Sequence, residues 1–258
     1  MAEGSAPLAR IDHLSVDVGS PSRRVVDDVS FDCSLGPDVV LLGANGSGKT
    51  TLLMALAGVV ARTGRVTLPE PVGLLVQDPS AAWLTNRVAD EVAFGLRSSA
   101  LPYAEVKRHV ADTLAKLGLS GFAGRNPRRL SGGEQQRVQL AALLVGRPRT
   151  LLIDEPGAHL DPATTREFAD ALSAWTPVPE LVIRSSHDPA SSLGADQLLV
   201  LDAGRLVASG PPLRLWGAGD LPVSPPALVS VSMRLIACGR LASPLPRNWA
   251  ELAARVPA

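Results

Sequence analysis

The stretch LGANGSGKTT, residues 42–51, decides the fold of this chain. It follows an apolar run at 39–41, and from Gly43 to Thr50 it fits the G-x-x-x-x-G-K-[ST] phosphate loop. The glycines let backbone N–H groups point inward around an anion, and the helix expected next adds its positive N-terminal end. The alternative is an ordinary glycine-rich turn between a strand and a helix. The predicted phosphate-binding residues are Gly43, Asn45, Gly46, Ser47, Gly48, Lys49, Thr50 and Thr51, with the Thr50 hydroxyl also predicted to bind Mg²⁺.

The composition narrows the class of protein and its partners. The 258 residues carry 25 basic and 25 acidic side chains, and this neutral balance does not indicate a nucleic-acid partner. No apolar run is long enough to span a membrane and no signal peptide is recognisable, so we expect an intracellular protein. Cys33 and Cys238 are far apart in the sequence and lack the spacing of a metal site, which predicts free, buried thiols.

The pattern of the chain predicts an α/β fold. Short apolar runs typical of strands occur before residue 77 and again at 150–153 and 181–184, and the runs 198–202 and 205–208 indicate a hairpin with its turn at 203–204. Residues from about 83 to 146 have helical spacing instead. After Gly210 the texture changes to short helices separated by prolines. We therefore predict one domain over 8–212, with a helical subdomain at about 83–146, and a small helical appendage over 213–258.

An acidic pair follows a predicted buried strand. The apolar run 151–153 leads directly into Asp154, Glu155 and Pro156. Ligands of open α/β sheets bind at the carboxyl ends of the strands, so Asp154 is a candidate Mg²⁺ partner and Glu155 a candidate base for an attacking water. The alternative is the start of a helix, where acidic residues simply favour the dipole.

A second anion site is indicated at Ser131, Gly132 and Gly133, which precede an amphipathic helix. Ser131 is also a good N-cap, and Glu134 three residues later completes a capping box. The two interpretations are compatible. Two helix starts that favour anions suggest that one nucleotide is bound from two sides.

In this order, the phosphate loop, Gln77, residues 130–134, the acidic strand end, Asp161 and His187 resemble the ATPase subunit of ABC transporters. The resemblance implies an ABC-type core with a mixed sheet flanked by helices, and ATP with Mg²⁺ held between two subunits paired head to tail. It implies that Gln77 contacts Mg²⁺ and water, that Asp161 crosses the dimer interface, and that His187 bonds the γ-phosphate. Without the resemblance, these three residues would be a strand-end polar group, an N-cap before Pro162 and an exposed loop histidine.

Residues 88–95 (VADEVAFG) and the proline-rich tail after residue 221 resemble, more narrowly, the ATPases of energy-coupling factor importers, which take up cobalt or vitamins. This resemblance implies a peripheral protein on the cytoplasmic face of the membrane. Its partners would be a second ATPase subunit, a transmembrane coupling protein and a small membrane protein that captures the substrate. Residues 81–84 would then either dock the coupling protein or pack inside the helical subdomain.

Two positions depart from the family pattern. Val18 stands where an aromatic residue usually stacks on adenine, and His159 is unusual in the loop after Pro156. No catalytic residue is missing, which argues against a regulatory subunit without turnover. The remaining alternatives are the ATPase subunit of another type of ABC transporter and a soluble ATPase acting on ribosomes or DNA. The second is disfavoured because such proteins usually have two nucleotide domains or a long insertion.

Overall fold

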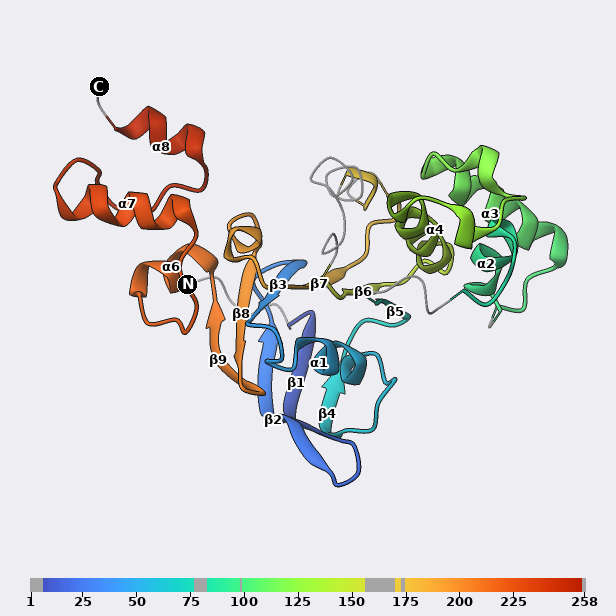
Figure 1. Cartoon of the computed structure of the whole chain (residues 1–258), viewed down its shortest axis with the longest axis horizontal. Helices are drawn as coiled ribbons and strands as arrows, with labels where there is room; N and C mark the ends of the chain where they lie inside the picture. Colours follow the sequence, from blue (N-terminus) through green and yellow to red (C-terminus); the bar gives the residue numbers. More distant parts are fainter. Residues whose placement is uncertain (1–6, 77–82, 98, 156–169, 173–174, 257–258) are drawn as a thin grey trace. The chain divides into compact units, whose positions relative to one another are not determined.

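The structure is a computed structural model that describes residues 7–76, 83–97, 99–155, 170–172 and 175–256. The chain forms two compact units, one made of Met1–Leu68 with Leu181–Ala258 and the other of Pro69–Glu180. Each unit has its own sheet strands and helices (Figure 1). Within the described residues, no helix has the length and apolar character needed to cross a membrane.

The first unit contains an antiparallel sheet of three strands. Its strands are β1 (Ala9–Val18), β2 (Arg23–Cys33) and β4 (Thr63–Thr67), in the order β2-β1-β4. The inward positions of β1 and β2 are apolar and fully buried, as at Ile11, Leu14 and Val26. This alternation of buried and exposed positions explains why these segments pair as strands with one face toward the core.

A second sheet in the same unit holds the phosphate loop. Strand β3 (Asp38–Leu42) lies between β7 (Leu181–Ser186) and β8 (Gln197–Asp202), parallel to both, and β9 (Arg205–Gly210) pairs with β8 in the antiparallel sense. Val39–Leu42 are fully buried, as expected of a central parallel strand. The loop after β3 leads into α1 (Lys49–Leu56). The short 3₁₀ helix η3 (Pro189–Ser192) follows β7.

The C-terminal helices belong to this first unit. They are α6 (Pro212–Ala218), α7 (Ala227–Ala237) and α8 (Trp249–Arg255), and α6 lies beside β8 and β9 (Figure 1). Trp216 of α6 and Val229 of α7 share a buried cluster with residues of β3 and β8, namely Val40, Leu42, Leu198 and Val200. Residues of α6 and α7, far along the chain from the phosphate-loop strand, thus form part of its core.

The second unit combines a parallel strand pair with helices. Strands β5 (Val72–Leu75) and β6 (Thr150–Ile153) pair in parallel. The helices are α2 (Val88–Phe94), α3 (Tyr103–Lys116) and α4 (Gly132–Leu144), with the 3₁₀ turns η1 (Ser120–Phe122) and η2 (Pro127–Arg129). Helix α2 packs on both α3 and α4, and its buried Glu91 carboxylate accepts hydrogen bonds from Thr85.

The structure confirms the predicted α/β fold, including the mixed sheet, the helical segment and the helical tail. The domain boundaries proposed from the sequence stay a prediction. The expectation of two buried thiols is wrong in one case, because Cys33 is buried in β2 whereas Cys238 is exposed after α7. Cys238 follows Ala237 at the end of the amphipathic helix, where the sequence offers no signal that separates an inward from an outward position.

We expect the two thiols to differ strongly in reactivity. Burial raises the pKa of Cys33 to about 12, so its reactive thiolate is scarce near neutral pH. Cys238 should react with a maleimide in the folded protein, whereas Cys33 should react only after denaturation. Mass spectrometry of labelled peptides measures both. Rapid labelling of Cys33 in the native protein would contradict the packing of β2.

Candidate nucleotide-binding site

The phosphate loop is shaped by backbone contacts that leave no room for side chains. A Cβ atom on Gly43 would lie 2.4 Å from the carbonyl oxygen of Leu201, and one on Gly48 would lie 2.9 Å from that of Val25. Gly46 and Gly48 also have φ values of +80° and +103°, which side-chain-bearing residues rarely adopt. Gly43 and Gly48 are therefore required by the neighbouring backbone, whereas Gly46, which has nothing within 4 Å of a would-be Cβ, is favoured by its φ alone.

Lys49 and Ser47 direct polar groups into the loop. The Lys49 side chain is 5% exposed, and its ammonium donates hydrogen bonds to the carbonyl oxygens of Gly43, at 3.0 Å, and Ala44, at 3.2 Å. Ser47 is buried as well, and its hydroxyl oxygen makes no hydrogen bond to the described part of the chain. Together with the N-terminus of α1, these groups provide the donors that a phosphate chain needs.

The turn between β8 and β9 supports the loop from behind. The Gly204 N–H donates to the carbonyl oxygen of Ser47, and the Asp27 N–H donates to that of Gly204, both at 2.9 Å. The Asp27 carboxylate also pairs with Arg24 and Arg205, and the hydrogen bond from Arg24 is the main reason why its pKa is lowered. The sequence indicated a turn at 203–204 but gave no signal that it contacts the phosphate loop.

His187 lies at the same sheet edge as the phosphate loop. Strands β3 and β7 are parallel, with Leu42 opposite Ser186. The Gly43 N–H continues this ladder by donating to the carbonyl oxygen of Ser186 at 3.3 Å. His187 is the next residue along the chain and its side chain is exposed. The structure thus brings the predicted γ-phosphate residue and the start of the loop together.

The predicted acidic pair lies in the second unit at the end of β6. All four residues of β6 are buried, and the Asp154 N–H donates to the carbonyl oxygen of Leu75 at 2.8 Å. Asp154 is 3% exposed. Glu155 has a φ of +44°, a strained value for this residue type that is often found at functional positions. The carboxylates therefore stand at the carboxyl edge of the β5–β6 pair.

Ser131, Gly132 and Gly133 lie at the start of α4, also in the second unit. The predicted capping box is confirmed, because the Ser131 hydroxyl accepts from the Glu134 N–H at 3.4 Å and Glu134 accepts from the Ser131 N–H at 2.8 Å. The hydrogen bonds from Ser131 lower the pKa of the Glu134 carboxyl. Ser131 and Gly132 are exposed, so the cap and the proposed anion site remain compatible.

Several predicted residues lie outside the described residues, namely Gln77, Asp161 and His159. At the possible docking segment 81–84, Trp83 is 6% exposed and packs into the unit, whereas Leu84 is 64% exposed. Arg128 holds Trp83 by donating to its carbonyl oxygen at 2.6 Å, whereas Ala81 and Ala82 lie outside the described residues. Val18 is 46% exposed at the end of β1.

The donors identified above suit Mg²⁺. Thr50 in the first unit offers a hydroxyl and Asp154 in the second offers a carboxylate, both of the hard oxygen type that Mg²⁺ prefers. No cluster of three or more potential ligands from His, Cys, Asp or Glu occurs among the described residues. Mg²⁺ usually keeps water and phosphate oxygens in its shell, so it needs few ligands from the protein.

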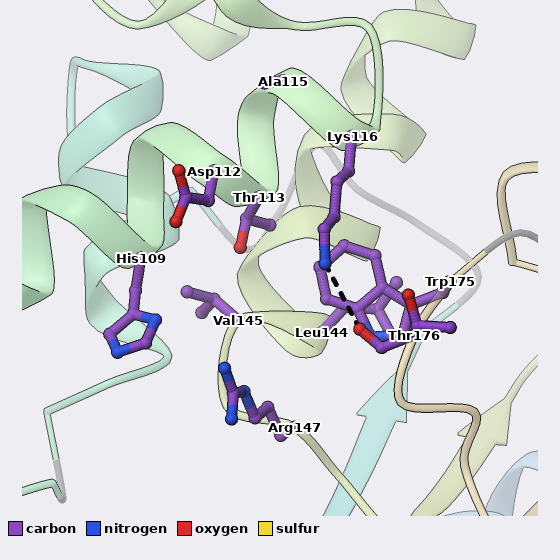
Figure 2. A pocket seen from close by; sticks show the side chains of 10 residues that line it. All are labelled: His109, Asp112, Thr113, Ala115, Lys116, Leu144, Val145, Arg147, Trp175 and Thr176. Atoms are coloured by element: carbon purple, nitrogen blue, oxygen red, sulfur yellow. Dashed lines mark hydrogen bonds between the residues drawn. The ribbon is translucent and has the colours of Figure 1, made fainter.

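A hollow of about 330 Å³ lies in the second unit away from these predicted residues (Figure 2). Helix α3 contributes His109, Asp112 and Lys116 to its wall, and Trp175 closes one side. The Lys116 ammonium lies 4.9 Å from the centre of the Trp175 ring and donates to the carbonyl oxygen of Thr176 at 3.3 Å. The Lys116 ammonium is thus engaged with the surrounding chain.

The loop, its lysine and the parallel strand arrangement define a phosphate-loop nucleotide-binding protein. The profile of the ABC transporter family matches residues 26–158. The energy-coupling factor transporter ATP-binding protein EcfA1 of Lacticaseibacillus paracasei is 32% identical over 227 residues, which cover 82% of each chain. The corresponding EcfA protein of Enterococcus faecium is 34% identical over 76% of each chain.

A solved structure, cbiO1 from Clostridium perfringens, described as part of the ABC transporter complex cbiONQ, has the same fold. It superimposes with a TM-score of 0.72, covers 91% of this chain and 98% of its own, and is 24% identical. With these relatives, the chain belongs to the ABC transporter family, among the ATP-binding proteins of energy-coupling factor transporters.

The support of the phosphate loop by Gly204 can be tested by substitution. A Cβ on Gly204 would lie 2.4 Å from the carbonyl oxygen of Val25, and its φ is +82°. Gly204→Ala should therefore weaken ATP binding about tenfold and lower the free energy of unfolding by roughly 2 kcal/mol or more. Calorimetric titration and urea unfolding measure these effects.

Gly118→Ala is the matched control, because Gly118 has a similar φ of +68° but nothing within 4 Å of its would-be Cβ. It should cost about 1 kcal/mol, the cost of the backbone conformation alone, and leave ATP binding unchanged. Equal ATP affinity in the two variants would remove the turn from the binding site.

Proposed function

We propose that this chain is the ATP-hydrolysing subunit of an energy-coupling factor importer for a micronutrient such as cobalt or a vitamin. Two such subunits, either two copies of this chain or this chain with a paralogue, would pair head to tail. Each ATP would then lie between the phosphate loop of one subunit and Ser131–Gly133 of the other. This arrangement gives both predicted anion sites a role in one binding event.

One observation carries the proposal. The Gly43 N–H bonds the carbonyl oxygen of Ser186, so the phosphate loop and His187 share one edge of the sheet. A nucleoside triphosphate held by Lys49 and the loop N–H groups would therefore present its terminal phosphate on the side of His187. Residues at two distant places in the sequence then act on the same group.

In the proposed reaction, water attacks the γ-phosphorus and the bond to the ADP oxygen breaks. Glu155 orients the water and accepts its proton, while Lys49 and His187 stabilise the charge on the transferred phosphoryl group. Bound Mg²⁺ would neutralise phosphate charge, held by Thr50, Asp154 and Gln77. Asp161 would contact the second subunit across the dimer.

The proposed partners in the membrane are a coupling protein with several spanning helices and a small protein that captures the substrate. Leu84 belongs to the segment expected to dock these partners, and its large apolar side chain is 64% exposed and so accessible to them. Its backbone is fixed, since the buried Glu91 carboxylate accepts from the Leu84 N–H at 3.3 Å. Through these partners, the chain would work at the cytoplasmic face of the membrane.

Glu155→Gln should retain ATP binding but lower kcat by about a hundredfold or more, because the amide cannot accept the proton of the attacking water. It should accumulate as an ATP-bound dimer in size-exclusion chromatography. Glu105→Gln, in the first turn of α3, is the control and should hydrolyse ATP at the wild-type rate. Turnover by Glu155→Gln at that same rate would exclude Glu155 as the base.

Purification of the tagged chain from its native membranes in mild detergent tests the importer assignment. A multi-spanning coupling protein and a small membrane protein should co-purify. Leu84→Asp should lose them, whereas Val59→Asp, which replaces an equally exposed apolar side chain in the first unit, should keep them. Recovery of ribosomes or soluble partners alone would refute the importer and leave the ATPase assignment intact.

A further inference from the structure

A buried hydrogen bond joins the C-terminal helices to the segment that follows His187. Trp216 of α6 is 2% exposed, and its indole N–H donates to the Ser192 hydroxyl oxygen at 2.9 Å. Ser192 is fully buried and its own hydroxyl donates to the carbonyl oxygen of Pro189 at 2.7 Å. The indole is therefore bonded to Ser192 at the end of η3, and the Ser192 hydroxyl in turn is bonded to Pro189 at its start.

Further hydrogen bonds connect η3 back to Ser186, the residue before His187. Asp188 is the N-cap of η3, and its carboxylate accepts from the Ala190 N–H at 2.9 Å. The Asp188 N–H in turn donates to the Ser186 hydroxyl at 3.0 Å. His187 and the N-cap residue Asp188 thus link a strand end bonded to Gly43 with a helical turn bonded to Trp216.

The indole itself is held firmly in place. Trp216 belongs to the buried cluster that includes Val40 and Leu42 of β3, the strand that ends at the phosphate loop, and Leu193 packs against the same cluster. A large ring packed among strand residues has little freedom to move. Its N–H therefore points in a fixed direction. Leaving this buried donor without an acceptor would cost free energy, so the bond to Ser192 is favoured.

We infer that Trp216 is a positioning residue for ATP hydrolysis, which sets the place of η3 through Ser192 and thereby the backbone of His187. This inference rests on the proposed contact of His187 with the γ-phosphate. It gives the C-terminal helices a function within the nucleotide site of their own unit. The binding of ATP itself, which depends on the phosphate loop, does not require this contact.

Trp216→Phe tests the inference, because phenylalanine keeps an aromatic ring in the core and removes the donor. Because misplacement of a catalytic group slows the chemical step more than binding, kcat for ATP should fall about tenfold while KM changes little. Hydrogen exchange of the amides of Ser191 and Leu193, which bond within this segment, should become faster. Trp249→Phe, at an exposed position of α8, should alter neither quantity.

The outcomes separate this inference from the proposed function. A lower kcat with faster exchange, at a temperature well below the unfolding midpoint, supports the positioning role. Faster exchange with an unchanged kcat overturns it, because the hydrogen bond would then serve stability alone, and an unchanged exchange rate overturns it as well. His187→Ala is measured in parallel: if it hydrolyses ATP like the wild type, the proposed role of His187 itself fails.

Discussion

The nucleotide site depends on the close approach of strand β3 to its two parallel neighbours. At Gly43 the backbone bonds β7 through Ser186 and touches β8 so closely that a Cβ would lie 2.4 Å from the carbonyl oxygen of Leu201. The loop therefore begins directly where β3 ends. The same register puts His187 at this edge, so one set of strand pairings defines the loop and the residue proposed to contact the γ-phosphate.

The sequence predicted those features that depend on residues close together in the chain. The phosphate loop, the capping box at Ser131 and the acidic strand end depend on residues within a few positions of one another, and the structure has each element where it was expected. The Gly204–Ser47 and Trp216–Ser192 contacts join residues far apart in the chain. No local sequence pattern pairs these residues, and only the folded strand order brings them together.

The organisation of the chain also divides into local features that the sequence predicts and distant contacts that it does not. A change of texture near residue 212 indicated an appendage, and the structure has short helices there. Periodicity describes only the element in which it occurs, so it did not show that α6 and α7 pack on β3 and β8. The first compact unit is discontinuous, because it gathers residues on both sides of 69–180. A single boundary along the sequence therefore cannot describe this unit.

Buried polar side chains separate structural from functional roles in this fold. Most are explained by a bond that stabilises the chain, as Glu91 accepts from Thr85 and Ser232 donates to the carbonyl oxygen of Leu228. Several others have a buried atom with no hydrogen-bond partner among the residues described, among them Gln136, Trp175 and Ser47, and of these Ser47 lies in the phosphate loop. Burying such a group costs free energy that folding alone does not recover. A phosphate oxygen would supply the missing interaction, so the loop carries a cost for folding that nucleotide binding offsets.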